Sequence, residues 1–218
     1  VVDQDGPVFE RWAEMKDAEV AIIWEARLGG YAAGVIGIES RPLPRIGEVP
    51  HDGPESWAGG TLFPLSSKKI ARGINAFSGR LPLVILANLS GFDGSPESLR
   101  KLQLEYGAEI GRAIVNFQGP ILFVVTARYH GGAYVVFSKA LNDNLQAAAL
   151  EGSYASVIGG APAAAVVFPG LVMKETNADP RIVEARKKLQ TDRAGYQQEF
   201  DDLFRRVHAE RQNALARR

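Results

Sequence analysis

The chain has 218 residues, of which 46% are apolar and 23% are charged, a composition that indicates a globular protein with a substantial core. Its formal net charge is zero, so neither nucleic acid nor an anionic membrane is a favoured partner. Cysteine is absent, which excludes disulfides, zinc–thiolate sites and cysteine nucleophiles and is consistent with a cytoplasmic location.

The first third of the chain predicts a strand hairpin followed by a loop and a helix. Two apolar runs, at 19–27 and 31–39, are joined by Gly29-Gly30 and predict two strands with a tight turn. The stretch 40–61 is rich in Pro and Gly and predicts a long loop. A helix is expected from a cap at Ser66 or Ser67 to Phe77.

The middle of the chain continues the alternation of strands and helices. A buried strand is predicted at 83–87, and a helix at 97–117, where apolar residues recur at helical spacing. A second buried strand is predicted at 121–126, ahead of the glycines at 131–132. The stretch 144–150 predicts a short helix. Strands that alternate with helices give an α/β fold class.

The last third becomes increasingly charged. A strand is predicted at 154–158 and a turn at 159–162. Asp179 is expected to cap a helix that begins at Pro180, and the segment 179–218 is predicted to be charged and helical. We expect residues 1–218 to form one domain. Because the chain starts at Val1 and stops inside a helical pattern, we expect it to be a piece of a longer protein.

Glycine-rich loops follow three of the predicted strands, at 90–94, 130–133 and 159–161. In an open α/β sheet the carboxyl ends of strands gather at one edge and form the ligand crevice. Such loops can be tight turns only, or they can present main-chain N–H groups to a ligand. Two N–H groups aimed at one point stabilise an oxygen that becomes negative during a reaction.

No motif for a side-chain nucleophile, a phosphate loop or a metal site is present, and the three histidines have no metal-ligand spacing. The remaining candidate side chains allow two interpretations each. Arg27 is either solvated or a fork that binds a carboxylate. His130 is either a structural residue or an acid or base. Tyr134 and Phe92 are core or pocket-wall aromatics.

Four segments, taken in order, resemble one enzyme family: 25–30 (EARLGG), 34–41 (GVIGIESR), 86–94 (LANLSGFDG) and 130–136 (HGGAYVV). They are similar to the carboxyltransferase component of biotin-dependent acyl-CoA carboxylases, above all to the C-terminal half of the acetyl-CoA carboxylase type. The resemblance runs from about residue 18 to about residue 170.

The resemblance implies a crotonase-like fold, a β-β-α superhelix with flanking helices, of which this chain is one half. It implies biotin, carried as carboxybiotin on a carrier domain, as the cofactor, and acyl-CoA as the substrate. The implied partners are a biotin carboxyl carrier domain, a biotin carboxylase component and the N-terminal carboxyltransferase half. In the family, sites lie where two subunits of a dimer meet, so a homodimer is expected.

The resemblance also implies the chemistry. Carboxybiotin releases CO2, the biotin anion takes the α-proton of the thioester, and the enolate captures CO2, so the protein needs to orient and to stabilise oxyanions. The N–H groups of Gly132 and Ala133, after Gly131, are expected to hold the biotin-side oxygen, and Arg27 to recognise the transferred carboxyl. Cofactor and substrate contacts are expected from six positions: His130, Tyr134, Gly91, Phe92, Gly160 and Ala161.

Departures from the family pattern keep other functions open. His130 stands where the eukaryotic enzymes have an arginine, and Tyr134 where they have a tryptophan. A different crotonase-fold enzyme, such as a hydratase, isomerase or decarboxylase, and a non-catalytic interaction module are the alternatives. The acyl preference is open, and the isolated piece is expected to be nearly inactive.

Overall fold

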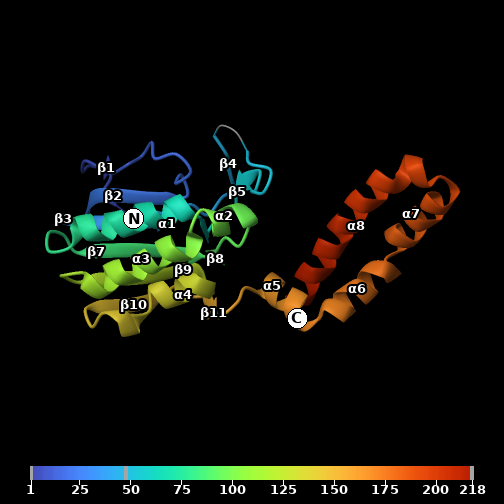
Figure 1. Ribbon diagram of the computed structural model, residues 1–218. Helices are drawn as coiled ribbons and strands as arrows, with labels where there is room; N and C mark the ends of the chain where they lie inside the picture. The colour runs from blue at the N-terminus through green and yellow to red at the C-terminus, as the bar shows by residue number, and fades with distance from the viewer. Residues whose placement is uncertain (1, 47–48, 217–218) are drawn as a thin grey trace. The chain divides into compact units, whose positions relative to one another are not determined.

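The structure, a computed structural model, describes residues 2–46 and 49–216 and divides the chain into two compact units, Val1–Val157 and Ile158–Arg218 (Figure 1). The first unit holds all the strands, and the second is built of helices. Each unit is described by itself below.

A seven-stranded sheet forms the centre of the first unit, with the order β1-β2-β3-β7-β9-β10 and with β11 also paired to β9. Strands β2 and β3 are antiparallel to each other, whereas β3, β7, β9 and β10 all run in the same direction. The strands are β1 (Phe9–Glu10), β2 (Ala21–Leu28), β3 (Tyr31–Ile38), β7 (Leu83–Leu89), β9 (Ile121–His130), β10 (Leu145–Ala149) and β11 (Tyr154–Ser156). The carboxyl ends of β3, β7 and β9 therefore share one edge.

Two helices, α1 (Pro64–Phe77) and α3 (Gln103–Asn116), lie side by side over one face of this sheet (Figure 1). Along β7 every second residue is buried, as in a strand with one face on the core. The core contains Ile23, Ile36, Ile85 and Phe123 from the strands and Ile74 and Phe77 from α1. The predicted α/β class is confirmed.

Short elements surround the sheet edge and connect the larger ones. They are β4 (Leu43–Pro44), paired with β5 (Ser56–Trp57); β6 (Thr61–Leu62), paired with β8 (Gly91–Phe92); α2 (Pro96–Arg100); α4 (Gly131–Val136); and the 3-10 helix η1 (Lys139–Leu141). The stretch 40–61, predicted as a loop, thus carries two short strands and the start of a third.

The second unit consists of α5 (Gly160–Val167), α6 (Pro169–Ala178), α7 (Pro180–Thr191) and α8 (Arg193–Ala216). Asp179 is the N-cap of α7, as predicted: its carboxylate accepts a hydrogen bond from the amide of Arg181 at 3.0 Å. The predicted turn at 159–162 is replaced by the first residues of α5. No helix of the described ranges is long and apolar enough to cross a bilayer.

The strand predictions at 19–27, 31–39, 83–87 and 121–126 are confirmed, although β9 continues to His130. The helix predicted at 144–150 is wrong. Residues Leu145–Ala149 form β10, parallel to Ile121–Val125 of β9. The sequence LQAAA has a high helix propensity, but pairing with a buried strand supplies its backbone hydrogen bonds and overrides that preference.

Two helix predictions also need correction. The helix predicted at 97–117 is two helices, because Leu102 lies in the left-handed region, with φ of 65°, between α2 and α3. The helix predicted to start at Ser66 or Ser67 begins at Pro64, with Phe63 as N-cap. Ser66 instead accepts a hydrogen bond from the amide of Phe63 at 2.8 Å, from the third position of the helix.

Candidate functional site

Two of the three glycine-rich loops meet at the carboxyl edge of the sheet. Strands β7 and β9 are parallel neighbours, so the residues that follow them emerge side by side. A Cβ on Gly131 would lie 3.5 Å from the Cα of Gly91, and both residues have positive φ, 62° and 126°. The distance is an ordinary van der Waals contact, and it is the positive φ of each residue, which side chains rarely adopt, that favours glycine at both positions.

The glycines of the second loop begin helix α4, and this frees main-chain N–H groups. The amide of Gly131 donates to the carbonyl of Val157 at 3.1 Å. The next two amides, of Gly132 and Ala133, lie in the first turn of α4, where a helix offers no acceptor. Within the described part of the chain neither makes a hydrogen bond. Two adjacent main-chain donors at the end of β9 therefore lack a hydrogen-bond partner among the described residues.

Phe92, from β8, packs on the glycine loop. A Cβ on Gly132 would come within 2.5 Å of the Phe92 ring, and a Cβ on Gly107 of α3 would meet the same ring at 2.5 Å. Phe92 is partly buried against the core. The ring thus fills the space between α3 and α4 and fixes the position of Gly132.

His130 is the last residue of β9 and is only 2% exposed. Its Nδ1 accepts a hydrogen bond from the main-chain N–H of Ser156 at 3.1 Å and lies 2.9 Å from the Ser156 hydroxyl. Because an amide N–H can only donate, the ring hydrogen of the neutral form sits on Nε2. This Nε2 is buried and has no hydrogen-bond partner among the described residues. The sequence did not indicate the role of Ser156.

Two tyrosines brace the first turn of α4. The Tyr129 hydroxyl donates to the carbonyl of Tyr134 at 3.1 Å, and the two rings lie 4.9 Å apart. Burial raises the pKa of the Tyr129 phenol well above its usual value, so it stays a donor. The Tyr134 side chain is 45% exposed. Tyr129 was not singled out from the sequence, because an aromatic residue near the end of a strand is an ordinary core residue.

Arg27 lies at the opposite edge of the sheet. It pairs with Ala32 at the start of β3, whereas the glycine loops follow the ends of β7 and β9. Its Nη1 donates to the carbonyl of Gly30 at 2.9 Å. The amides of Gly30 and Gly29 bond to the Asp3 carboxylate and lower its pKa. The structure therefore does not bring Arg27 together with Gly131, Gly132 and Ala133 of the same chain.

Gly160 and Ala161 begin α5 in the second unit. The surroundings of both residues lie outside what the structure describes, and the contacts predicted for them remain predictions. Among the residues that are described, no group of histidine, aspartate and glutamate side chains is arranged to hold a metal ion.

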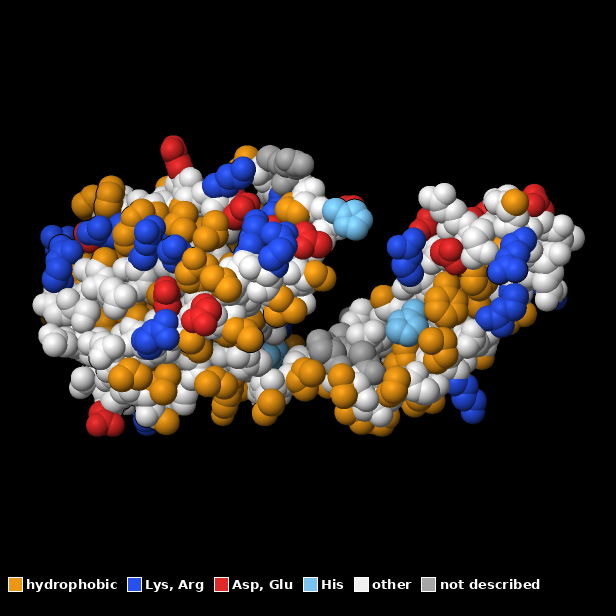
Figure 2. All heavy atoms as spheres, in the orientation of Figure 1, with side chains coloured by type: hydrophobic (Ala, Val, Ile, Leu, Met, Phe, Trp, Pro, Cys, Tyr) orange, Lys and Arg blue, Asp and Glu red, His pale blue; other side chains and the backbone are white. Residues whose placement is uncertain are grey.

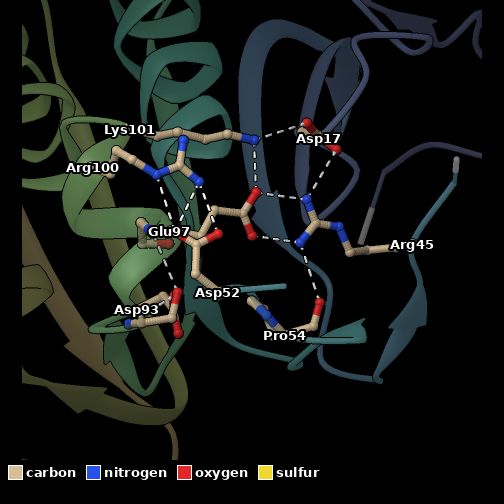
Figure 3. Close-up of polar contacts among 10 residues, drawn as sticks. Asp17, Arg45, Asp52, Pro54, Asp93, Glu97, Arg100 and Lys101 are labelled. Atoms are coloured by element: carbon tan, nitrogen blue, oxygen red, sulfur yellow. Dashed lines mark hydrogen bonds and ion pairs between the residues drawn. The ribbon is translucent and has the colours of Figure 1, made fainter. Parts of the chain in front are cut away.

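A buried ion cluster joins α2 to the stretch 40–61 (Figure 3). The Glu97 carboxylate, whose side chain is 3% exposed, accepts hydrogen bonds from both terminal nitrogens of Arg45, at 2.6 and 2.8 Å, and from Lys101 at 2.6 Å. Asp17 is a further partner, 3.9 Å from Arg45 and 3.7 Å from Lys101. Bonding to Arg45, above all, lowers the pKa of Glu97 to about 2.

The same cluster has an exposed rim. Arg100 forms a two-pronged pair with Asp52, the closest contact being 2.8 Å (Figure 3). In the space-filling view, basic and acidic side chains stand next to one another over α2 (Figure 2). The Arg45 guanidinium also lies 4.3 Å from the centre of the Trp57 ring. Ion pairs with α2 thus hold the stretch 40–61, which lies between β3 and α1, in place. The sequence alone gave no signal for this cluster, since its members are far apart in the chain.

Comparison with known proteins identifies relatives for most of the chain. The model of the carboxyl transferase domain family matches residues 11–214. Acetyl-CoA carboxylase of Saccharomyces cerevisiae (strain ATCC 204508 / S288c) is 34% identical over 137 residues, which are 57% of this chain and 6% of that protein. Acetyl-CoA carboxylase of Schizosaccharomyces pombe (strain 972 / ATCC 24843) is 32% identical over 152 residues, 65% of this chain and 7% of that protein.

Solved structures share the fold. The beta subunit of P. aeruginosa geranyl-CoA carboxylase superposes with a TM-score of 0.61 at 24% identity, over 84% of this chain and 31% of that one. Transcarboxylase 12S, solved with methylmalonyl-coenzyme A and methylmalonic acid bound, superposes with a TM-score of 0.62 at 23% identity, over 78% of this chain and 30% of that one. The predicted crotonase-like fold is confirmed. The chain spans about a third of these subunits and a much smaller part of the curated relatives.

Proposed function

This chain belongs to the carboxyl transferase domain family, and on that premise we propose that it is one half of a carboxyltransferase that moves a carboxyl group from carboxybiotin to the α-carbon of an acyl-CoA. Acetyl-CoA or a related short thioester is the proposed substrate, because the curated relatives with 32–34% identity are acetyl-CoA carboxylases. The observation that carries the proposal is the pair of unpartnered amides at Gly132 and Ala133.

The residues present fit a carboxylated biotin. When bound, that cofactor would supply an activated carboxyl group and, once CO2 has left it, the base that takes the α-proton of the thioester. An oxyanion on such a group would require hydrogen-bond donors rather than acceptors. The end of β9 offers Gly132 and Ala133 N–H groups in the first turn of a helix, where the backbone dipoles also favour an anion.

We assign the other side chains supporting roles. Phe92 and Tyr129 hold α4 so that its two amides stay aimed in one direction, through the Gly132 contact and the Tyr134 carbonyl. Preorganised donors stabilise a transition state without reorganisation at the moment of reaction. His130, with its hydrogen on Nε2, is a further donor at the same strand end. Arg27, at the opposite edge, is expected to act only in a site that includes a second chain.

The proposal includes the partners that the family relationship implies. We propose that a biotin carrier domain, a biotin carboxylase component and an N-terminal carboxyltransferase half complete the system, with a dimer as the working form. A role in the biosynthesis of fatty acids and a cytoplasmic location are proposals of the same kind.

The decisive test removes one N–H without changing a side chain. Ala133 is replaced by lactic acid, so that the amide becomes an ester and the donor is lost. In the matched control, Lys139, the first residue of η1, is replaced by the α-hydroxy acid that keeps the lysine side chain, since the N–H of Lys139 has no acceptor in the described ranges. Each protein is mixed with an N-terminal half, acetyl-CoA and carboxybiotin, and malonyl-CoA is measured by mass spectrometry.

Loss of one oxyanion donor is expected to slow turnover by a factor of about 100 to 1,000 at Ala133, and the Lys139 ester is expected to match the unmodified chain. Equal rates for the two esters would refute the assignment of the amides. Turnover of enoyl-CoA without biotin, with no malonyl-CoA formed, would replace the proposed reaction by a hydratase or isomerase activity.

A further inference from the structure

Arg128 differs from the ion-paired arginines of the first unit in the partners that hold it. Arg11 pairs with Glu25, Arg45 with Glu97, and Arg100 with Asp52. Arg128, by contrast, is partly buried and is held by two neutral acceptors, the Asn88 side-chain oxygen at 2.9 Å and the Gly59 carbonyl at 3.2 Å. No carboxylate lies within ion-pair distance of it in the part of the chain that the structure describes.

The neutral groups around Arg128 are themselves held in place by further contacts. Asn88, at the end of β7, donates from its amide to the Ser40 hydroxyl at 2.9 Å, which fixes its oxygen toward the arginine. Gly60 has a φ of 77°, and a Cβ there would come within 2.7 Å of the guanidinium. Thus residues from three separate segments close around a single cation.

The acidic side chain on the neighbouring strand is already engaged. By register Glu39 follows the end of β3 next to Asn88, but its carboxylate accepts hydrogen bonds from the amide and the side chain of Arg41. These bonds, led by the Arg41 amide, lower the pKa of Glu39. Glu39 is therefore a satisfied anion and leaves the charge of Arg128 without compensation.

A guanidinium that is ordered in advance and lacks a counter-ion favours an incoming oxyanion. Two nitrogens of the fork are used by neutral oxygens, and the group keeps further N–H donors and a full charge. Bonds from arginine to carboxylate or phosphate are about twice as strong as bonds between neutral groups. Ordering the side chain beforehand removes part of the entropy cost of binding.

The position of Arg128 links it to the candidate site. It lies on β9 only two residues before His130, at the edge where the loops with Gly91 and Gly131 meet. We propose that Arg128 is a second anchor of this site and binds an oxyanion carried by one of the two substrates. This inference rests on the proposed function. Two groups have the required chemistry: the carboxylate that is transferred and the phosphates of coenzyme A.

Binding of small probes to the 218-residue chain, measured by titration calorimetry at low salt, tests the proposal without turnover. Malonate represents the carboxylate, while coenzyme A and dephospho-coenzyme A represent the phosphates. The variants are Arg128→Gln, which removes the charge, and Arg128→Lys, which keeps the charge but loses the fork. Arg112→Gln is the matched control, because Arg112 is on the surface of α3 with a side chain that is 61% exposed.

A third variant, Asn88→Asp, keeps the test valid if substitution of Arg128 prevents folding. It keeps Arg128 in place and gives the guanidinium a carboxylate partner of the same shape. Both Asn88→Asp and Arg128→Gln are expected to weaken probe binding about tenfold or more, Arg128→Lys less, and Arg112→Gln not at all. A loss seen with malonate assigns the carboxylate, and a loss confined to coenzyme A assigns its phosphates.

The proposal is overturned if no probe binds the unmodified chain, or if Arg128→Gln and Asn88→Asp bind every probe as tightly as it does. Either outcome leaves the ester experiment at Ala133 unaffected, because that experiment measures turnover through main-chain donors. Conversely, failure of the Ala133 test would not alter calorimetric binding at Arg128. The two ideas can thus be refuted separately.

Discussion

Replacing Glu97 by glutamine tests whether the buried ion cluster stabilises the first unit. Glu97 is almost completely buried and receives hydrogen bonds from Arg45 and Lys101. Its pKa falls from an ordinary value of 4.5 to about 2, mainly through Arg45. By linkage, this shift corresponds to about 3 kcal/mol of stability, which is present above the ordinary pKa and lost as the pH falls toward 2.

The Glu97→Gln variant is therefore expected to unfold about 3 kcal/mol more easily at pH 7, since the charge of Arg45 then lacks its main partner. In urea this corresponds to a midpoint lower by roughly 1 M or more. The difference between the two proteins is expected to shrink as the pH falls from about 4.5 to 2, because protonation of Glu97 removes the same interaction.

Tryptophan fluorescence measures the unfolding of the first unit, which contains the ion cluster. The three tryptophans, Trp12, Trp24 and Trp57, all belong to the first unit, and the Trp57 ring touches Arg45. Glu109→Gln, on the exposed surface of α3, is the matched control and is expected to change stability by less than about 0.5 kcal/mol. A Glu97→Gln variant as stable as this control at pH 7, or a difference that stays constant down to pH 2, would refute the reasoning.

Three further predictions concern the core, the glycine loop and the second unit. Phe77→Ala empties a fully buried position and is expected to cost about 3–5 kcal/mol in urea unfolding. Gly132→Ala places a Cβ 2.5 Å from the Phe92 ring, so a destabilisation of about 1–3 kcal/mol is expected; no change in the urea midpoint would show that the ring can move aside. Hydrogen bonds from Arg181 and Arg211 lower the pKa of Asp179. The protection of α7 amides in hydrogen exchange is therefore expected to be lost only below the ordinary carboxylate pKa. The Asp179→Asn variant is expected to abolish this pH dependence.

Patterns within short stretches of sequence predicted elements of both units. The apolar runs at 19–27 and 83–87 were found as strands, because strands that pack one face on a core are rich in apolar and β-branched residues. The Asp179 cap was found because a side-chain oxygen before Pro180 satisfies local amides. The glycines at 131–132 pointed to exposed main-chain donors, since glycine permits the backbone conformations that side chains disfavour.

By itself, then, the sequence determined the fold class, the positions of β2, β3, β7 and β9 along the chain and the family, all of which depend on residues close together in the chain or on their order. Only the tertiary structure decided that 145–149 is a strand, that Leu102 divides a helix, and that Arg27 lies across the sheet from Gly132. It alone also revealed Glu97 with Arg45 and Arg128 with Asn88. The reason is physical: pairing partners and buried charges are chosen by contacts between distant segments, and such contacts leave no periodicity in the sequence.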